Sequence, residues 1–262
     1  MRILFVGDIV GRPGRKIFSA LLPLLRKEFS KIDFVIVNGE NAAAGKGLTD
    51  KIMNELFAAG VDGITSGNHI WDRSDFFTVL DGEPRVIRPA NYPPGCPGLG
   101  WTVLSKNGMK LGLINLQGRV FMPDIDCPFR KADEVLETFA DVPVLVDFHA
   151  EATSEKRVLG FYLDGRVSAF LGTHTHVQTA DEEILPGGTA YISDVGMTGS
   201  FQSAIGMTLE SVLPRFLTSL PSRFQVASGD LRLNAVIVDV DNETKKAVSI
   251  QRIARSLCET EA

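Results

Sequence analysis

The feature that most constrains the fold is an alternation of apolar runs and helical patterns in the first seventy residues. Apolar side chains recur at helical spacing over residues 17–29, where Pro23 predicts a kink or a break. A second helix is expected over residues 49–59. Three apolar, β-branched runs are typical of buried strands: residues 2–6, 34–37 and 62–65. This β-α-β-α-β order predicts an α/β fold with a parallel layered sheet.

The rest of the chain continues this pattern with further strands and two more helices. Residues 11–14 are interpreted as a turn, and residues 81–100 as a loop rich in Pro and Gly. No repeat and no linker separates two units, so we predict a single domain over residues 1–262. A small excursion within 85–130 or 195–230 is expected to cover the site. Strands are expected at 110–115, 144–147, 169–171 and 189–193, helices near 131–139 and 152–163, and a hairpin over 234–240 and 247–253.

Composition excludes several classes of protein. The 262 residues are 44% hydrophobic and carry a formal net charge of −5, which argues against disorder and against a broad nucleic-acid-binding face. No apolar run approaches the roughly 18 residues of a membrane span, and Gly7-Asp8 comes too early for a signal peptide. Cys96, Cys127 and Cys258 lie far apart, so we expect no disulfide framework and a cytoplasmic location. The oligomeric state is left open, with a homo-oligomer as one alternative.

Every histidine of the chain follows a predicted strand or its short extension. Ligands of open α/β sheets bind beyond the carboxyl ends of strands, and acids and amides gather at the same ends here. Carboxylates, amides and imidazoles without thiolates suit Mn, Fe, Co or Zn, and the set is large enough for two ions. The residues expected at this edge are Asp8, Glu40, Asn41, Asn68, His69, His149, His174 and His176.

Each of these residues also has a purely structural interpretation. A single His after a strand commonly forms a structural hydrogen bond, and Asp8 and Asn68 are typical of caps and turns. In an extended chain His174 and His176 would point to the same side, which favours a metal site. Glu40 follows an apolar strand and would be costly to bury without a partner or a metal ion. The convergence of these residue types on one edge favours the metal site.

Other motifs leave two interpretations open. The glycines at 7, 11 and 14 precede a helix but lack the G-x-G-x-x-G spacing of a dinucleotide loop. Arg12 and Arg15 either hold a phosphate near the helix start or lie on the surface as solvated charges. Residues 194–199 form either a substrate loop or a plain connection. Ser154, Ser193 and the three cysteines lack the adjacent base that nucleophilic catalysis requires.

The polar motifs follow one another in a recognisable order. Gly7-Asp8, Gly39-Glu40-Asn41, Gly67-Asn68-His69, an isolated His149 and residues 172–176 resemble the motifs of calcineurin-like metallophosphoesterases. More narrowly, the chain is similar to the YmdB-like branch of bacterial metallophosphoesterases, from Met1 to about Ile253. This resemblance implies a layered α/β sandwich with β-sheets flanked by helices and the metal site at strand ends. The stretches that carry the narrower resemblance are residues 7–15, 38–42, 88–93, 173–179 and 193–199.

The resemblance also implies two metal ions, with Fe or Mn favoured and Zn or Co as alternatives. The broad superfamily usually begins with Asp-x-His, but Val10 stands at the His position, and Asn41 is interpreted as the replacement ligand. Glu40 takes the place of the usual bridging Asp. An amide oxygen in place of an imidazole favours the harder ions. One ion would take Asp8, Glu40, Asn41 and His176, and the other Glu40, Asn68, His149 and His174.

These parts imply a reaction. A hydroxide between the ions would attack phosphorus in line, and His69, which is not needed as a ligand, would act as general acid. The resemblance implies a small nucleotide phosphodiester as substrate, with 2′,3′-cyclic nucleotides as the expected class. A phosphomonoesterase, a metal-dependent amidohydrolase and a non-catalytic nucleotide- or RNA-binding regulator are the alternatives. An amidohydrolase usually needs a Lys or an acid poised at the metals, and no strand-end Lys is evident.

Overall fold

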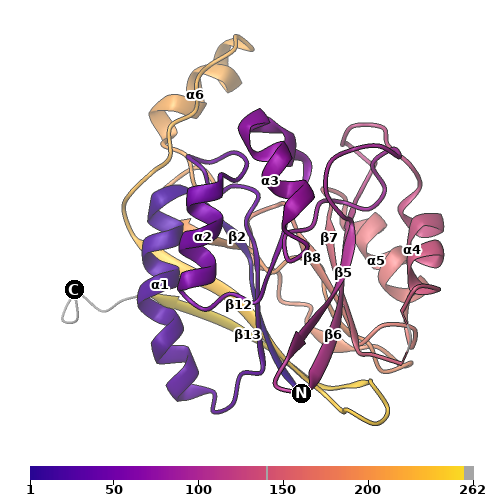
Figure 1. The fold of residues 1–262 in the computed structure, drawn as a ribbon. Helices are drawn as coiled ribbons and strands as arrows, with labels where there is room; N and C mark the ends of the chain where they lie inside the picture. Colours follow the sequence, from indigo (N-terminus) through magenta and orange to yellow (C-terminus); the bar gives the residue numbers. More distant parts are fainter. Residues whose placement is uncertain (140, 257–262) are drawn as a thin grey trace.

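Two β-sheets packed face to face form the centre of the molecule (Figure 1). The computed structural model describes residues 1–139 and 141–256. The first sheet contains β1 (Arg2–Val6), β2 (Asp8–Ile9), β3 (Phe34–Asn38), β4 (Gly63–Thr65), β11 (Met197–Ser200), β12 (Leu231–Val240) and β13 (Ala247–Ser256). The second contains β5 (Trp101–Lys106), β6 (Met109–Gln117), β7 (Val144–His149), β8 (Ala169–Thr173), β9 (Glu183–Ile184) and β10 (Ala190–Ile192).

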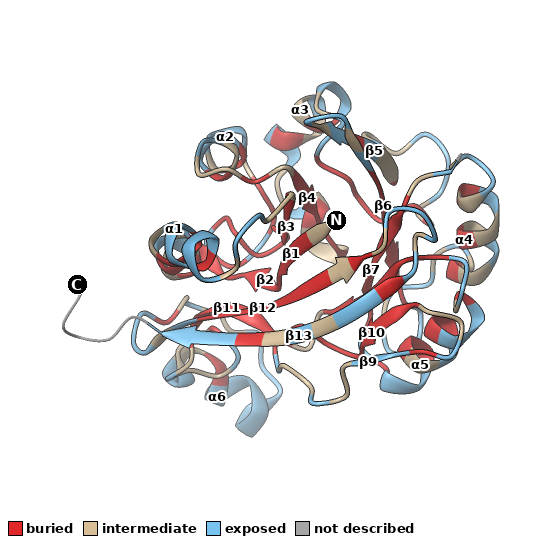
Figure 2. Ribbon diagram, turned by 90° about the horizontal axis from the view of Figure 1, so that it is seen from below, coloured by how far each residue is buried: buried red, intermediate tan, exposed pale blue. Residues whose placement is uncertain are grey.

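Helices cover the outer faces of the two sheets, which confirms the predicted α/β sandwich. Helices α1 and α2 cover the first sheet, and α4 and α5 the second (Figures 1 and 2). Their buried side chains pack against those of the strands. The helices are α1 (Gly11–Glu28), α2 (Asp50–Ala58), α3 (Phe77–Gly82), α4 (Pro128–Leu136), α5 (Thr153–Tyr162) and α6 (Leu209–Thr218), with short 3-10 turns at Asn68–Asp72 and Ser74–Phe76. Within the described residues, no helix is long and apolar enough to cross a bilayer.

The apolar run of β1 is continuous because the strand is buried on both faces. Leu4 and Val6 pack in the cluster under the helices, whereas Ile3 and Phe5 pack between the two sheets. Each face of β1 therefore belongs to a different part of the core, and together they fix its register.

Parallel pairing brings the carboxyl ends of several strands to one edge of each sheet. In the first sheet β1 pairs in parallel with β3, and β3 with β4. In the second sheet β6, β7, β8 and β10 are parallel neighbours. The chain therefore leaves these strands on the same side, where the polar motifs lie.

The first helix begins earlier than predicted and continues past its internal proline. The turn predicted over residues 11–14 was wrong, because these residues form the first turn of α1. Pro13 is tolerated there because the first N–H groups of a helix have no partner within it. Pro23 does not break the helix, which runs to Glu28.

Short and edge strands were harder to predict than the central ones. The strand β5, an edge strand in which only Leu104 is buried, and the short strands β2 and β9 were not predicted from the sequence. Residues 197–199, interpreted as part of a loop or connection, lie in β11. Within the expected excursion at 195–230, α6 projects beyond the sheets (Figure 1). The extent of the domain over 1–262 stays a prediction.

Candidate metal centre

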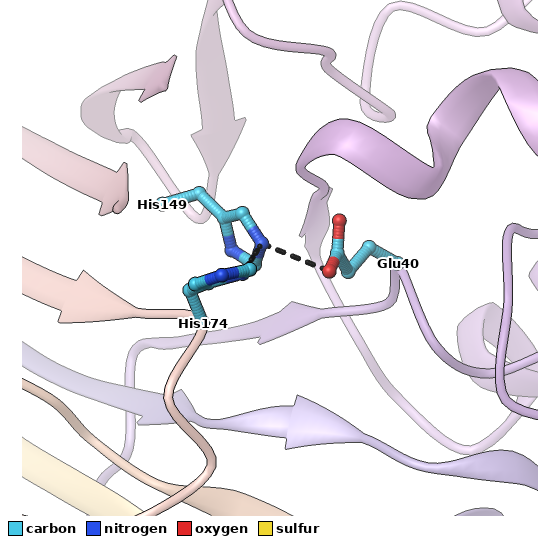
Figure 3. Close-up of side chains that lie close together, drawn as sticks. All are labelled: Glu40, His149 and His174. Atoms are coloured by element: carbon cyan, nitrogen blue, oxygen red, sulfur yellow. Dashed lines mark hydrogen bonds and ion pairs between the residues drawn. The ribbon is translucent and has the colours of Figure 1, made fainter. Parts of the chain in front are cut away.

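A cluster of one carboxylate and two imidazoles lies where β3, β7 and β8 end. Glu40 Oε1 is 2.8 Å from His149 Nε2, and His174 Nδ1 is 3.0 Å from the same nitrogen. One ligand atom from each residue falls within 4.8 Å of the others, and Figure 3 shows the three side chains facing one another. This is a geometry in which a divalent metal ion can be held.

Protons are unevenly shared within this cluster. Burial opposes charge on Glu40, but the adjacent His149 outweighs it and lowers the pKa of the carboxyl to about 2. Burial likewise disfavours charge on His149, but Glu40 and Asp8 raise its pKa to about 9. Burial and the neighbouring His149 lower the pKa of His174 to about 3. These shifts favour a carboxylate on Glu40 beside a protonated His149, and a neutral His174.

A hydrogen-bonded chain behind His149 fixes the orientation of its ring. The Thr173 hydroxyl donates to Asp147 Oδ1 at 2.7 Å, so its oxygen accepts from His149 Nδ1 at 2.9 Å. Asn38 donates to the other Asp147 oxygen at 2.9 Å. With Nδ1 committed to Thr173, Nε2 is the nitrogen that faces Glu40 and the cluster. Such outer partners are typical of metal-binding histidines.

Among the described residues, Asp8 and Asn68 each have a buried side-chain oxygen that accepts no hydrogen bond. Asp8 is fully buried, and its Oδ2 accepts the His174 N–H at 3.2 Å, but Oδ1 has no hydrogen-bond partner among the described residues. The amide oxygen of Asn68 is likewise buried and unpartnered in the described structure. Burial raises the pKa of the Asp8 carboxyl. Unpartnered buried oxygens are costly, and a cation satisfies them.

Asn41 and His176 form a second pair of facing ligand atoms. Asn41 Oδ1 lies 3.2 Å from His176 Nε2. The amide nitrogen of Asn41 donates to the Gly45 carbonyl at 3.0 Å, and His176 Nδ1 donates to the Ile205 carbonyl at 2.9 Å. In the neutral imidazole both facing atoms are therefore acceptors. A cation suits this arrangement, so these residues fit a metal ion.

The candidate ligands come from both sheets. The candidate oxygen ligands lie in or after strands of the first sheet: Asp8 in β2, Glu40 and Asn41 after β3, and Asn68 after β4. The candidate imidazoles lie at or after the ends of β7 and β8 of the second sheet: His149, His174 and His176.

The extended conformation expected for His174 and His176 was wrong. The value of φ is +103° at His174 and +66° at His176, and non-glycine residues rarely adopt such values. The strain is held by hydrogen bonds, from the His174 N–H to Asp8 and from the Thr175 N–H to Asp194 at 3.0 Å. Each such residue costs of the order of 1–3 kcal/mol, and strain of this kind clusters at functional sites.

Glycine is required where Gly67 passes the cluster. A Cβ atom there would lie 2.2 Å from Glu40 Oε2 and 2.2 Å from His149 Cδ2. The backbone before Asn68 and His69 therefore packs directly against the centre, and only glycine leaves the space open.

Comparison with known proteins decides the family. A model of the YmdB-like protein family matches residues 4–253. The chain belongs to this family. It is 55% identical over 255 residues to the 2′,3′-cyclic-nucleotide 2′-phosphodiesterase of Bacillus subtilis, and the match covers 97% of this chain and 96% of the relative. The YmdB-like resemblance predicted from the motifs is thereby confirmed, and this relative is named as a phosphoesterase, the enzyme class that the motifs predicted.

Two solved structures share the YmdB-like fold over nearly the whole chain. A hypothetical protein of Thermus thermophilus superposes with a TM-score of 0.91 at 46% identity, covering 97% of this chain and 99% of that one. A structure described as a novel phosphatase of Mycoplasma pneumoniae gives a TM-score of 0.91 at 36% identity, covering 97% and 93%.

In this YmdB-like protein His69 lies beside the cluster of Glu40, His149 and His174 and is not part of it. Its N–H donates to Glu40 Oε2 at 3.1 Å, and its Nδ1 is 3.0 Å from Asp72 Oδ2. The ring is half-buried, so one edge is accessible. Asp72, which was not identified from the sequence, contacts Nδ1, whereas Nε2 forms no hydrogen bond with the described residues.

Lys156 and Asp194 hold the loop that carries His174 and His176. Lys156 is buried and donates to the Thr173 carbonyl at 2.9 Å and to Asp194 Oδ2 at 2.8 Å. Lys156 was not identified from the sequence, although a Lys in the apolar stripe of α5 was a usable signal. Because its ammonium is committed to these groups, Lys156 does not supply the free base of an amidohydrolase.

The two arginines near the start of α1 differ. Arg15 pairs with Glu55 at 3.1 Å and donates to the Ala42 carbonyl at 2.6 Å, so it is committed to structure. Arg12 is exposed and forms no ion pair or side-chain hydrogen bond with the described residues. Arg12 is therefore the better placed of the two to meet a phosphate.

Proposed function

We propose that this protein hydrolyses the phosphodiester bond of small nucleotides, with 2′,3′-cyclic nucleotides as the substrate class. The observation that carries the proposal is the set of facing acceptors: Asn41 Oδ1 against His176 Nε2, beside the unpartnered Asp8 Oδ1. Such a set calls for cations. The 55% identity to a protein named as a 2′,3′-cyclic-nucleotide 2′-phosphodiesterase supports the substrate class.

We propose that two ions would be held here, with Glu40 as a ligand of both. Bound divalent ions supply an activated water and neutralise charge on the phosphoryl oxygens. Four oxygen donors and three imidazoles, with no thiolate, favour Fe or Mn over Zn or Co. One site would comprise Asp8, Glu40, Asn41 and His176, and the other Glu40, Asn68, His149 and His174.

His69 is proposed as the general acid. The Asp72 carboxylate accepts from Nδ1–H and would stabilise the doubly protonated ring, whose Nε2–H would then donate to the leaving oxygen. The oxygen of a water bonds to phosphorus as the bond between phosphorus and the ribose 2′-oxygen breaks, and the 2′-oxygen receives the His69 proton. The proton lost by the water restores His69 through solvent. The product is a 3′-phosphomonoester. Glu40 holds the backbone N–H of His69 and so couples the acid to the centre.

The test is metal analysis followed by a substrate screen. Protein purified without chelator is expected to contain up to two transition-metal ions per chain and to hydrolyse 2′,3′-cyclic nucleotides faster than 3′,5′-cyclic ones. Glu40→Ala is expected to lower the metal content, because the shared ligand is lost. Absence of transition metal together with no hydrolysis in added Mn would overturn the proposal, and full metal in Glu40→Ala would refute the shared ligand.

A phosphomonoesterase is the second candidate, since the related Mycoplasma pneumoniae structure is described as a phosphatase. Hydrolysis of p-nitrophenyl phosphate, set against bis-p-nitrophenyl phosphate, separates the two activities. The free Cys96 and Cys127 suit a reducing cytoplasm, which we propose as the location.

A further inference from the structure

A cavity of about 850 Å³ adjoins the segments that build the centre. Its wall includes Ala44 and Lys46, in the loop that begins at Asn41, and Asp72, which contacts His69. It also includes Met207, two residues after the Ile205 carbonyl that binds His176. The cavity wall is therefore built from segments that are close in sequence to Asn41, His69 and His176 or in contact with them. None of these three residues lines the cavity itself.

The wall of this cavity is strongly basic although the chain as a whole is acidic. Its lining includes Arg12, Lys46, Arg73, Arg215 and Arg223, against one acid, Asp72.

Most of this positive charge is not neutralised by the protein. Within the described residues, Arg12, Lys46 and Arg223 form no ion pair. Arg73 donates only to the carbonyls of Ala43 and Lys46. Uncompensated cations gathered in a concave wall attract polyanions.

An aromatic side chain lies among these cations. Phe224 lines the cavity, and the Arg215 guanidinium is 5.7 Å from the centre of its ring. An aromatic face beside arginines is the arrangement on which bases of single-stranded nucleic acids stack. The cavity volume lies within the range of about 300–1,000 Å³ of small-ligand sites, which limits the occupant to a few nucleotides.

We propose that this cavity binds the upstream nucleotides of a short oligoribonucleotide whose 3′-terminal 2′,3′-cyclic phosphate is hydrolysed at the centre. The proposal rests on the proposed function and extends its substrate class. A cyclic mononucleotide brings one phosphate, which the centre itself engages, whereas each added nucleotide brings a further phosphate to the basic wall. The cavity is a local subsite and not a broad nucleic-acid-binding face.

The experiment compares kcat/KM for a tetranucleotide ending in a 2′,3′-cyclic phosphate with kcat/KM for 2′,3′-cyclic AMP. The wild type is expected to prefer the tetranucleotide, and its advantage is expected to shrink as salt rises. In Arg12→Gln/Arg223→Gln the ratio of the two constants is expected to fall by about tenfold. The slope of log kcat/KM for the tetranucleotide against log salt concentration is expected to become shallower by about one for each phosphate that the variant no longer binds.

Arg130→Gln is the control for the loss of a positive charge elsewhere on the surface. Arg130 is an exposed cation on α4, away from the cavity, and its removal changes the net charge without touching the wall. It is expected to keep the wild-type ratio. A wild-type ratio at or below one, or an unchanged ratio in the double variant, would overturn the inference. Failure to hydrolyse either cyclic ester would instead overturn the proposed function, so the two failures are distinguishable.

Discussion

The amide oxygen of Asn41 lies 3.2 Å from Nε2 of His176, and the other polar atom of each side chain donates a hydrogen bond to a backbone carbonyl. We expect Asn41→Leu to lower the metal content by one ion per chain, because one oxygen donor is removed. Asn41→Asp keeps an oxygen at the same position and is expected to retain both ions. Elemental analysis of the purified variants measures this, and full metal content in Asn41→Leu would show that Asn41 is not a ligand.

Thr173 is expected to control metal affinity without contacting the metal. Thr173→Val removes the hydroxyl that accepts from His149 and donates to Asp147, so the imidazole loses its orientation. We expect the affinity for metal to fall by about 10–100-fold, as measured by titration of the chelated protein. Thr173→Ser keeps the hydroxyl and is expected to bind metal as the wild type does. Equal affinities in the Val and Ser variants would contradict the orienting role.

His69→Ala is expected to lower kcat for 2′,3′-cyclic nucleotides by about 10²–10⁴-fold while the metal content stays unchanged. The loss is expected to be much smaller with bis-p-nitrophenyl phosphate, because its leaving group needs no proton. Parallel kinetics on the two substrates check this. Equal losses on both would show that His69 acts otherwise than as an acid, and loss of metal would reassign it as a ligand.

Lys156→Met is expected to destabilise the protein because it leaves the buried Asp194 carboxylate without its cation. Two backbone N–H groups still donate to Asp194, so we expect the low end of the usual range, about 3 kcal/mol. For a chain of this size that corresponds to a fall in Tm of about 6–12 °C. Adding Asp194→Asn is expected to recover part of the loss, and calorimetry of both variants distinguishes this from a simple packing defect.

The sequence predicted the central strands and the positions of the candidate ligands because both depend on local patterns. Apolar runs such as that of β3 mark strands buried on both faces, and parallel strands deliver Glu40 and His149 to one edge. The supporting groups were not predictable in this way. Asp147 and Thr173 meet only after β7 and β8 pair, and the positive φ of His174 depends on contacts with Asp8, which is distant in the sequence.

The division of the candidate ligands, with oxygens from one sheet and imidazoles from the other, has a consequence for unfolding. Bound ions would link the two layers at a single point, so that neither could open without breaking metal–ligand bonds. Amide hydrogen exchange in β3 and in β8 should then slow together when metal is added. In chelated protein the two sheets should exchange as separate cooperative units.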